Sequence, residues 1–137
     1  MSKLLYDFID GRGRNVIADW LNSLDQVLRG RMRAKIKVLA TTDGELPPKM
    51  LTPTKEPHVK ELRVNSKEAL RLLVCRGPLK GRDQTEYTLL YGAIEKDSKY
   101  VPKNALTLAE TNRLLVIADP INRRRLRKDE DPEETEE

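Results

Sequence analysis

The stretch of this sequence that most constrains the fold is residues 87–113, YTLLYGAIEKDSKYVPKNALTLAETNR. Residues 87–94 carry no charge and are mostly aromatic, aliphatic or β-branched, which predicts a buried strand. Pro102 predicts the first turn of a helix, because the N–H that proline lacks would have no partner there. The charged connection at residues 95–100 leaves the end of the strand, where a rigid scaffold usually presents functional groups.

The rest of the chain predicts further elements around this stretch. Their bounds follow from three signals: hydrophobic periodicity, the turn at residues 65–68, and Asp25 as an N-cap. Strands are expected at residues 3–9, 59–65, 69–76 and 87–94, and helices at residues 15–24, 25–40 and 102–117. The sequence therefore predicts an α+β fold: a small antiparallel sheet of about four strands with an N-terminal helical hairpin and a C-terminal helix.

Charge is distributed unevenly along the chain. The net charge is +4, but residues 129–137 hold seven acids and no base. Residues 1–128 then keep 26 basic against 15 acidic residues, a net charge of +11. A surface this basic favours a nucleic acid or a ribonucleoprotein as partner over simple solvation. We expect one domain at residues 1–120 and a charged, mobile tail at residues 121–137.

Composition also bears on the compartment and on cofactors. The chain has one cysteine, Cys75, no recognisable signal peptide and no apolar run of membrane-spanning length. We therefore expect a protein of the reducing cytoplasm without a membrane partner. One cysteine, one histidine and no spaced acidic group before the tail predict no metal site and no cofactor.

Arg71 is the most informative single residue, because it interrupts the apolar run ALRLLVC. Burying an arginine in a strand without a partner is costly, so we expect Arg71 to face a groove or an acid. In the preceding strand Glu61 and Arg63 alternate with Leu62 and Val64. If Leu62 faces the N-terminal helices, Glu61 and Arg63 share the opposite face.

Further cations are placed to contact a polyanion. Arg29, Arg33 and Lys37 lie four apart and form one stripe on the helix expected at residues 25–40. Such a stripe is usually solvated surface, but here it also suits a phosphate backbone, where it would set affinity and salt dependence. Lys99, in the charged connection, is a further candidate contact to RNA.

A series of short motifs follows in chain order: Trp20-Leu21, Arg31-Met32-Arg33, Lys49-Met50-Leu51, Glu61-Leu62-Arg63, Leu70-Arg71-Leu72, residues 89–96, Val101-Pro102, and Ala109 with Arg113. In this order the motifs resemble those of the RelE/HigB toxin superfamily, in particular its phage Gp49-like HigB branch, over residues 5–117. The chain departs from the family pattern at Glu95, where a lysine is usual, and at Leu70 and Ile94, where aromatic residues are usual.

The resemblance implies a RelE-like fold and a metal-independent endoribonuclease. Such a protein would be the toxin of a toxin–antitoxin system, cleaving mRNA on the ribosome and paired with a cognate helix-turn-helix antitoxin. The alternative is a RelE-like regulatory protein without nuclease activity, which binds RNA, the ribosome or a protein partner. The glutamate at position 95 and the missing aromatic residues favour this alternative.

Cleavage by a ribose 2′-OH requires removal of its proton, stabilisation of charge on the phosphate and protonation of the leaving 5′ oxygen. By the resemblance, Arg71 and then Arg63 would stabilise the phosphate, because a guanidinium matches two phosphate oxygens and keeps its charge. Lys96 would bind phosphate or neutralise the leaving group.

Three residues are candidates for proton transfer. Glu61 would be the general base, or it would simply pair with an arginine. Histidine titrates near neutrality, so His58, the only histidine, would act as acid or base, or it would be a loop residue beside Pro57. Tyr100 would stack on a base or donate a proton.

Overall fold

The computed structural model describes residues 3–79 and 86–125. In these residues the elements follow one another as β1 (Leu4–Phe8), α1 (Val16–Ser23), α2 (Gln26–Thr41), β2 (Thr52–Pro53), β3 (Lys60–Asn65), β4 (Ala69–Arg76), β5 (Glu86–Lys96), β6 (Lys99–Val101), α3 (Ala105–Ala118), a 3-10 turn η1 (Pro120–Asn122) and β7 (Arg123–Arg125). None of the helices in this part of the chain is long and apolar enough to cross a membrane.

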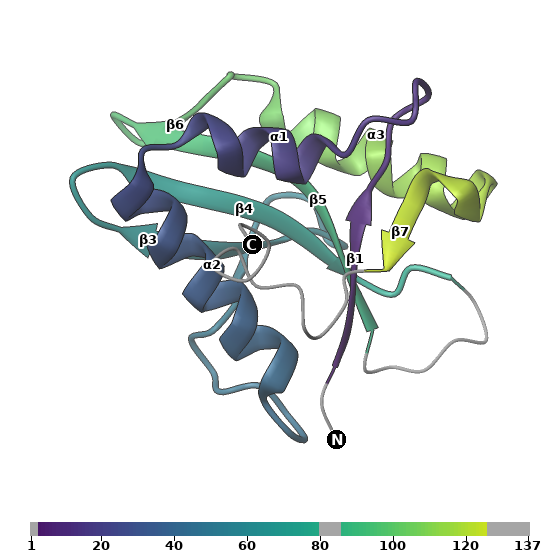
Figure 1. The fold of residues 1–137 in the computed structure, drawn as a ribbon, viewed down its shortest axis with the longest axis horizontal. Coiled ribbons are helices and arrows are strands. Elements are labelled where there is room, and N and C mark those ends of the chain that lie inside the picture. The colour runs from purple at the N-terminus through teal and green to yellow at the C-terminus, as the bar shows by residue number, and fades with distance from the viewer. Residues whose placement is uncertain (1–2, 80–85, 126–137) are drawn as a thin grey trace, which may run out of the picture.

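The strands form one sheet in the order β2-β3-β4-β5-β1-β7, with β6 paired to β5 (Figure 1). Strand β1 runs parallel to β5, and the other strand pairs are antiparallel. The expectation of about four antiparallel strands was wrong, because the described residues form seven strands in a mixed sheet. The additional strands β2, β6 and β7 have two or three residues each, too few to show an alternating pattern.

The two N-terminal helices begin at side chains that cap them. Asn15 accepts hydrogen bonds from two backbone N–H groups in the first turn of α1, and Asp25 accepts one in the first turn of α2. Arg29 donates to the carbonyl oxygens of Leu21 and Leu24 at distances of 3.1 and 2.9 Å. Arg29 therefore satisfies the end of α1 and ties α2 to it.

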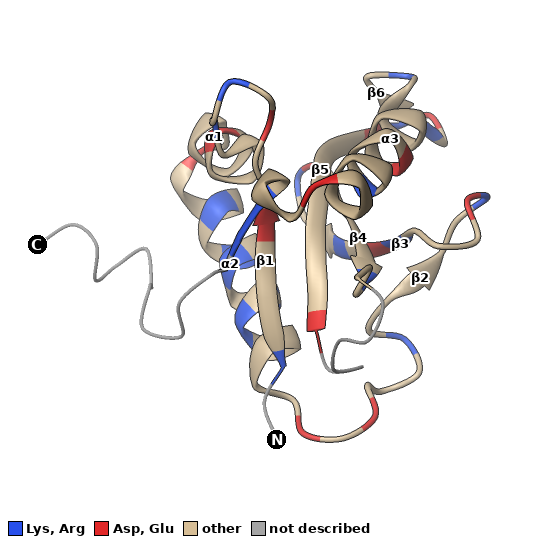
Figure 2. Ribbon diagram, turned by 90° about the vertical axis from the view of Figure 1, so that its right-hand side faces the viewer, with Lys and Arg blue, Asp and Glu red and all other residues tan. Residues whose placement is uncertain are grey.

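Helices cover both faces of the sheet (Figure 2). Helices α1 and α2 pack on the face that carries Leu62 and Leu72, and α3 packs on the face that carries Leu73 and Leu90. Neighbouring strand residues point to opposite faces, so the sheet separates these two cores.

The approach of α1 to the sheet depends on Gly92. A Cβ atom at this position would lie 1.9 Å from the indole ring of Trp20, so a larger residue fits only if the Trp20 ring or the helix that carries it moves. Trp20 is thus partly buried and packs against the core.

The charged connection after β5 differs from its prediction. Strand β5 continues to Lys96, turns at Asp97 and Ser98, and returns as β6. Both turn residues have positive φ, 52° and 64°. A two-residue hairpin turn needs this conformation so that its twist matches the right-handed twist of the two strands. Charged residues here lie on an exposed hairpin, which is why their composition resembled that of a loop. Helix α3 begins at Ala105, so Pro102 precedes the helix and is not its first residue.

The segment after α3 also holds a strand. Arg123–Arg125, expected to belong to the charged tail, pairs antiparallel with β1. Arg123 is buried against Glu86, with 2.9 Å between Nη2 and Oε1, and its guanidinium lies 3.5 Å from the centroid of the Tyr6 ring. These partners are remote in sequence, so a run of arginines alone indicated a solvated tail. The acidic end and most of the loop at residues 77–86 lie outside the described residues.

Candidate functional site

Ionisable side chains from four strands meet on the face of the sheet that α3 partly covers. We call them the sheet cluster: Glu61, Arg63, Arg71, Glu95 and Tyr100. The register places Arg63 opposite Arg71, and Glu95 opposite Tyr100. Directly opposed residues point to the same face, and Leu62 and Leu70 point to the other core. The prediction that Glu61 and Arg63 share the face away from the first two helices is confirmed.

Arg71 lies at the centre of the sheet cluster, and its side chain is only 6% exposed. Its Nε donates to Oε1 of Glu95 at 2.7 Å, and its Nη1 donates to the carbonyl oxygen of Leu70 at 2.8 Å. Oε1 of Glu61 lies 4.0 Å from the same Nε. Arg71 was expected to face a groove or an acid; it faces an acid, and that acid is the glutamate that departs from the family pattern.

Glu61 joins the two sides of the cluster. Its Oε1 accepts a hydrogen bond from Nε of Arg63 at 2.8 Å, and its Oε2 accepts one from the hydroxyl of Tyr100. The Glu61 side chain is 7% exposed, whereas that of Arg63 is 44% exposed. Glu61 therefore has both carboxylate oxygens engaged, and Arg63 is the more accessible guanidinium.

The environment of Tyr100 fixes its protonation state. Burial raises the pKa of the phenol, and the hydrogen bond to the Glu61 carboxylate raises it further. The same carboxylate raises the pKa of Arg63 through its hydrogen bond. Tyr100 therefore keeps its proton at neutral pH and acts in this cluster as a hydrogen-bond donor.

Formal charges within the sheet cluster balance, because two arginines face two glutamates. An incoming phosphate must therefore compete with a carboxylate for each guanidinium. The competition is easiest at Arg63, whose side chain is nearly half exposed. The cluster supplies cations, carboxylates and a protonated phenol at one place, which suits a reaction that moves protons and adds charge to a phosphate.

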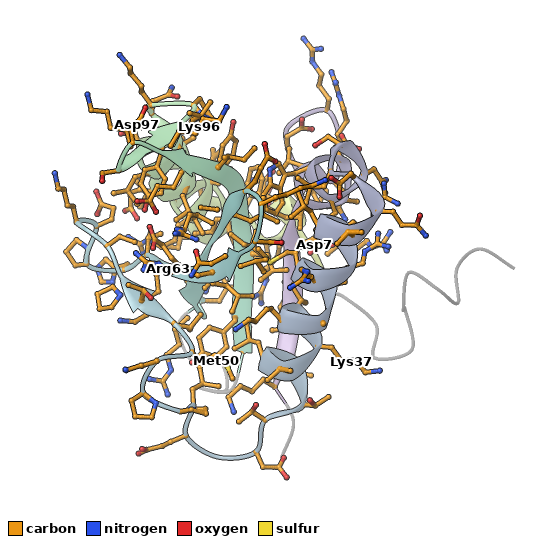
Figure 3. The ribbon with its side chains drawn as sticks, turned by 90° about the vertical axis from the view of Figure 1, so that its left-hand side faces the viewer. Asp7, Lys37, Met50, Arg63, Lys96 and Asp97 are labelled. Atoms are coloured by element: carbon orange, nitrogen blue, oxygen red, sulfur yellow. The ribbon has the colours of Figure 1, made fainter. Side chains whose placement is uncertain are left out.

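Lys96 and Lys99 are exposed and face each other at the tip of the β5–β6 hairpin. Alternation along the strands turns them to the face opposite Glu95 and Tyr100. Figure 3 shows Lys96 at the tip of this hairpin, away from Arg63. The structure therefore does not bring the two lysines into the sheet cluster.

His58 is exposed just before β3. It is close enough to Glu110 of α3 to help lower the pKa of that carboxyl, although the hydrogen bonds from Arg113 are the main cause. The described residues show no hydrogen bond between His58 and the sheet cluster. His58 thus lies beside α3 and outside the cluster.

The basic stripe of α2 lies on the other side of the sheet from the cluster (Figure 2). Arg29 is occupied by the end of α1, and Arg33 is half-buried. Lys37 is exposed. The stripe therefore forms a surface separate from the sheet cluster, with Arg31 and Lys35 as additional exposed cations.

Glu95 is the residue that sequence reasoning missed as a member of the site. The signal available was the buried arginine, which needs an acid. The identity of that acid depends on the register between β4 and β5, which shifts at an irregularity between Leu73 and Val74.

In the part of the chain that the structure describes, no group of His, Cys, Asp and Glu side chains could hold a metal ion.

Comparison with known proteins gives one match. The sequence model of the family described as Phage derived protein Gp49-like (DUF891) matches residues 19–114, a span that contains the whole sheet cluster. No curated protein and no solved structure matches the chain. The family is commonly related to toxin–antitoxin systems. Because the match covers most of the chain, the protein belongs to the phage-derived Gp49-like family, which is part of the RelE/HigB-like toxin superfamily.

Proposed function

We propose that this protein is the toxin of a toxin–antitoxin pair and that it cleaves mRNA on the ribosome at the sheet cluster. The observation that carries the proposal is the cluster itself: two guanidinium groups, two carboxylates and a protonated phenol connected by hydrogen bonds on one sheet face. These are the groups that metal-independent cleavage by a 2′-OH requires. Family membership supports the same conclusion.

Each group has a role in this proposal. Arg63 is the first contact of the scissile phosphate, because its guanidinium is the most accessible of the cluster. Arg71 stabilises the charge that develops on the phosphate from behind, where burial strengthens its field. Tyr100 donates a proton to the departing 5′ oxygen. A carboxylate of the cluster accepts the proton of the 2′-OH.

The exposed cations of α2 and the β5–β6 hairpin supply binding in this proposal. Lys37 of α2 and Lys99 of the hairpin would contact the phosphates of mRNA or ribosomal RNA. A helix-turn-helix antitoxin would be the protein partner, and the cytoplasm would be the compartment. His58 and Lys96 keep no catalytic role in it, because neither reaches the cluster.

Inducible expression in a bacterial host tests the proposal. The wild-type chain should stop growth and create new mRNA ends within translated regions. Arg63→Ala should abolish both effects, and Arg12→Ala is the matched control, because Arg12 is an exposed arginine outside the cluster. Normal growth with soluble wild-type protein, or full toxicity of the Arg63→Ala variant, would contradict the proposal.

A second candidate is a binding protein without nuclease activity. It is favoured by the 2.7 Å contact between Arg71 and Glu95, which neutralises the guanidinium that phosphate would need. This candidate predicts harmless overexpression together with RNA or ribosome binding that weakens steeply with salt. Growth arrest with new mRNA ends would exclude it.

A further inference from the structure

The sheet cluster contains two carboxylates, and the structure distinguishes them. Both oxygens of Glu61 accept hydrogen bonds, from Arg63 and from Tyr100, and its side chain is 7% exposed. Glu95 is 28% exposed, and only its Oε1 accepts a hydrogen bond, from Arg71. Within the described residues Oε2 of Glu95 has no hydrogen-bond donor. Glu95 is therefore the carboxylate with an oxygen left for a substrate.

We propose that Glu95 is the general base of this centre and that Glu61 is a positioning residue. The inference rests on the proposed function and assigns one step of it. Glu61 holds the phenol of Tyr100 and the guanidinium of Arg63, whereas Arg71 holds the carboxylate of Glu95 by one oxygen. The free oxygen then stands next to the cation that stabilises the phosphate.

The cleavage step moves two protons, one to Glu95 and one from Tyr100. Oε2 of Glu95 takes the proton of the ribose 2′-OH, and O2′ forms a bond to phosphorus. The bond from phosphorus to O5′ breaks, and O5′ takes the phenolic proton of Tyr100. Tyr100 then recovers a proton from solvent, and Glu95 releases its proton to solvent. The products are a 2′,3′-cyclic phosphate and a 5′-hydroxyl.

This assignment gives the departure at position 95 a chemical meaning. The lysine usual in the family pattern contributes charge, whereas a glutamate contributes a proton acceptor. Strand β5 places this acceptor two residues beyond Ala93, which lies opposite Arg71 in the register. Glu95 and Arg71 are therefore diagonal neighbours on one face, within reach of each other's side chains.

The test uses the full chain, purified, with ribosomes translating a short mRNA, and follows cleavage in single-turnover reactions across a range of pH. Glu95→Gln removes the base but keeps an oxygen that can accept the hydrogen bond of Arg71. We expect its cleavage rate to fall about 100-fold or more, and the acidic limb of the pH–rate profile to disappear. Ribosome binding should stay unchanged.

Three further variants separate the base from its neighbours. Glu61→Gln should slow cleavage but keep the acidic limb, because Glu95 remains. Glu110→Gln removes the carboxylate of another arginine pair, Arg113 with Glu110, and should leave rate and profile unchanged. Glu95→Asp keeps a carboxylate and should retain partial activity with the acidic limb, which guards against a misfolded glutamine variant.

Several outcomes would overturn the inference. Unchanged or faster cleavage by Glu95→Gln would make Glu95 a brake or a structural residue. Loss of the acidic limb in Glu61→Gln alone would make Glu61 the base. Absence of cleavage by the wild-type chain would overturn the proposed function as well. Failure of the Glu95 assignment alone looks different, because the wild-type chain then still cleaves and only the variants behave otherwise than expected.

Discussion

Arg123 is predicted to be a major determinant of stability, although it lies in a segment that its composition marks as a tail. The side chains of Arg123 and Glu86 are 4% and 3% exposed, and 2.9 Å separates Nη2 from Oε1. Oε1 makes no hydrogen bond within the described residues, so the charge of Arg123 is what compensates it. Arg123 also contacts the hydroxyl of Thr88 at 3.3 Å and covers the ring of Tyr6.

Arg123→Ala would leave the Glu86 carboxylate buried without its partner. Removal of one member of a buried ion pair costs about 3–5 kcal/mol, a large part of the stability of an ordinary domain. The free energy of unfolding, measured by urea denaturation followed by circular dichroism, should fall by this amount. Arg12→Ala, at an exposed arginine outside the sheet, should change it by only about 0.5 kcal/mol.

A double variant separates the ion pair from simple packing. Arg123→Met with Glu86→Leu replaces both charges by apolar side chains, which is often neutral for a buried pair. Most of the lost stability should therefore return. A loss below about 1 kcal/mol in Arg123→Ala, or a double variant as unstable as the single one, would refute the reasoning.

Three further results are expected. Gly92→Ala should lower the free energy of unfolding by about 1–3 kcal/mol, because its Cβ meets Trp20. The Cβ of Gly30→Ala in α2 meets no atom within 4 Å, so this variant should raise the free energy of unfolding by about 0.5–1 kcal/mol. Burial raises the pKa of Cys75 to about 12, so a thiol reagent near pH 8 should label it only after unfolding; rapid labelling of the folded protein would contradict this. Lys35→Ala should reduce the slope of log affinity for RNA against log salt by about 1, and an unchanged slope would remove α2 from the interface.

Local signals in the sequence predicted the helices and the four longer strands. Asn15 and Asp25 cap their helices, and apolar residues at helical or alternating spacing identify the buried faces, so these elements need no information from distant residues. Strands β6 and β7 could not be predicted, because each has three residues and depends on its partner strand. The burial of Arg123 likewise depends on Glu86, which is remote in sequence.

The site was predictable only in part. Alternation placed Glu61 and Arg63 on one face, and the cost of an unpaired buried charge predicted a groove or an acid beside Arg71. The acid is Glu95 because a register shift between β4 and β5 places Glu95 on the same face as Arg71. No local pattern in the sequence indicates this shift. The same hairpin geometry turns Lys96 away from the cluster.

The chemistry of the RNA ends tests the central claim most directly. Purified wild-type protein would be added to ribosomes translating a defined mRNA, and both ends at each new break would be identified. Attack by a 2′-OH within the sheet cluster predicts 5′-hydroxyl ends and 2′,3′-cyclic phosphates, absent when Arg63→Ala replaces the wild type. Intact mRNA, or breaks that carry 5′-phosphates, would contradict the account.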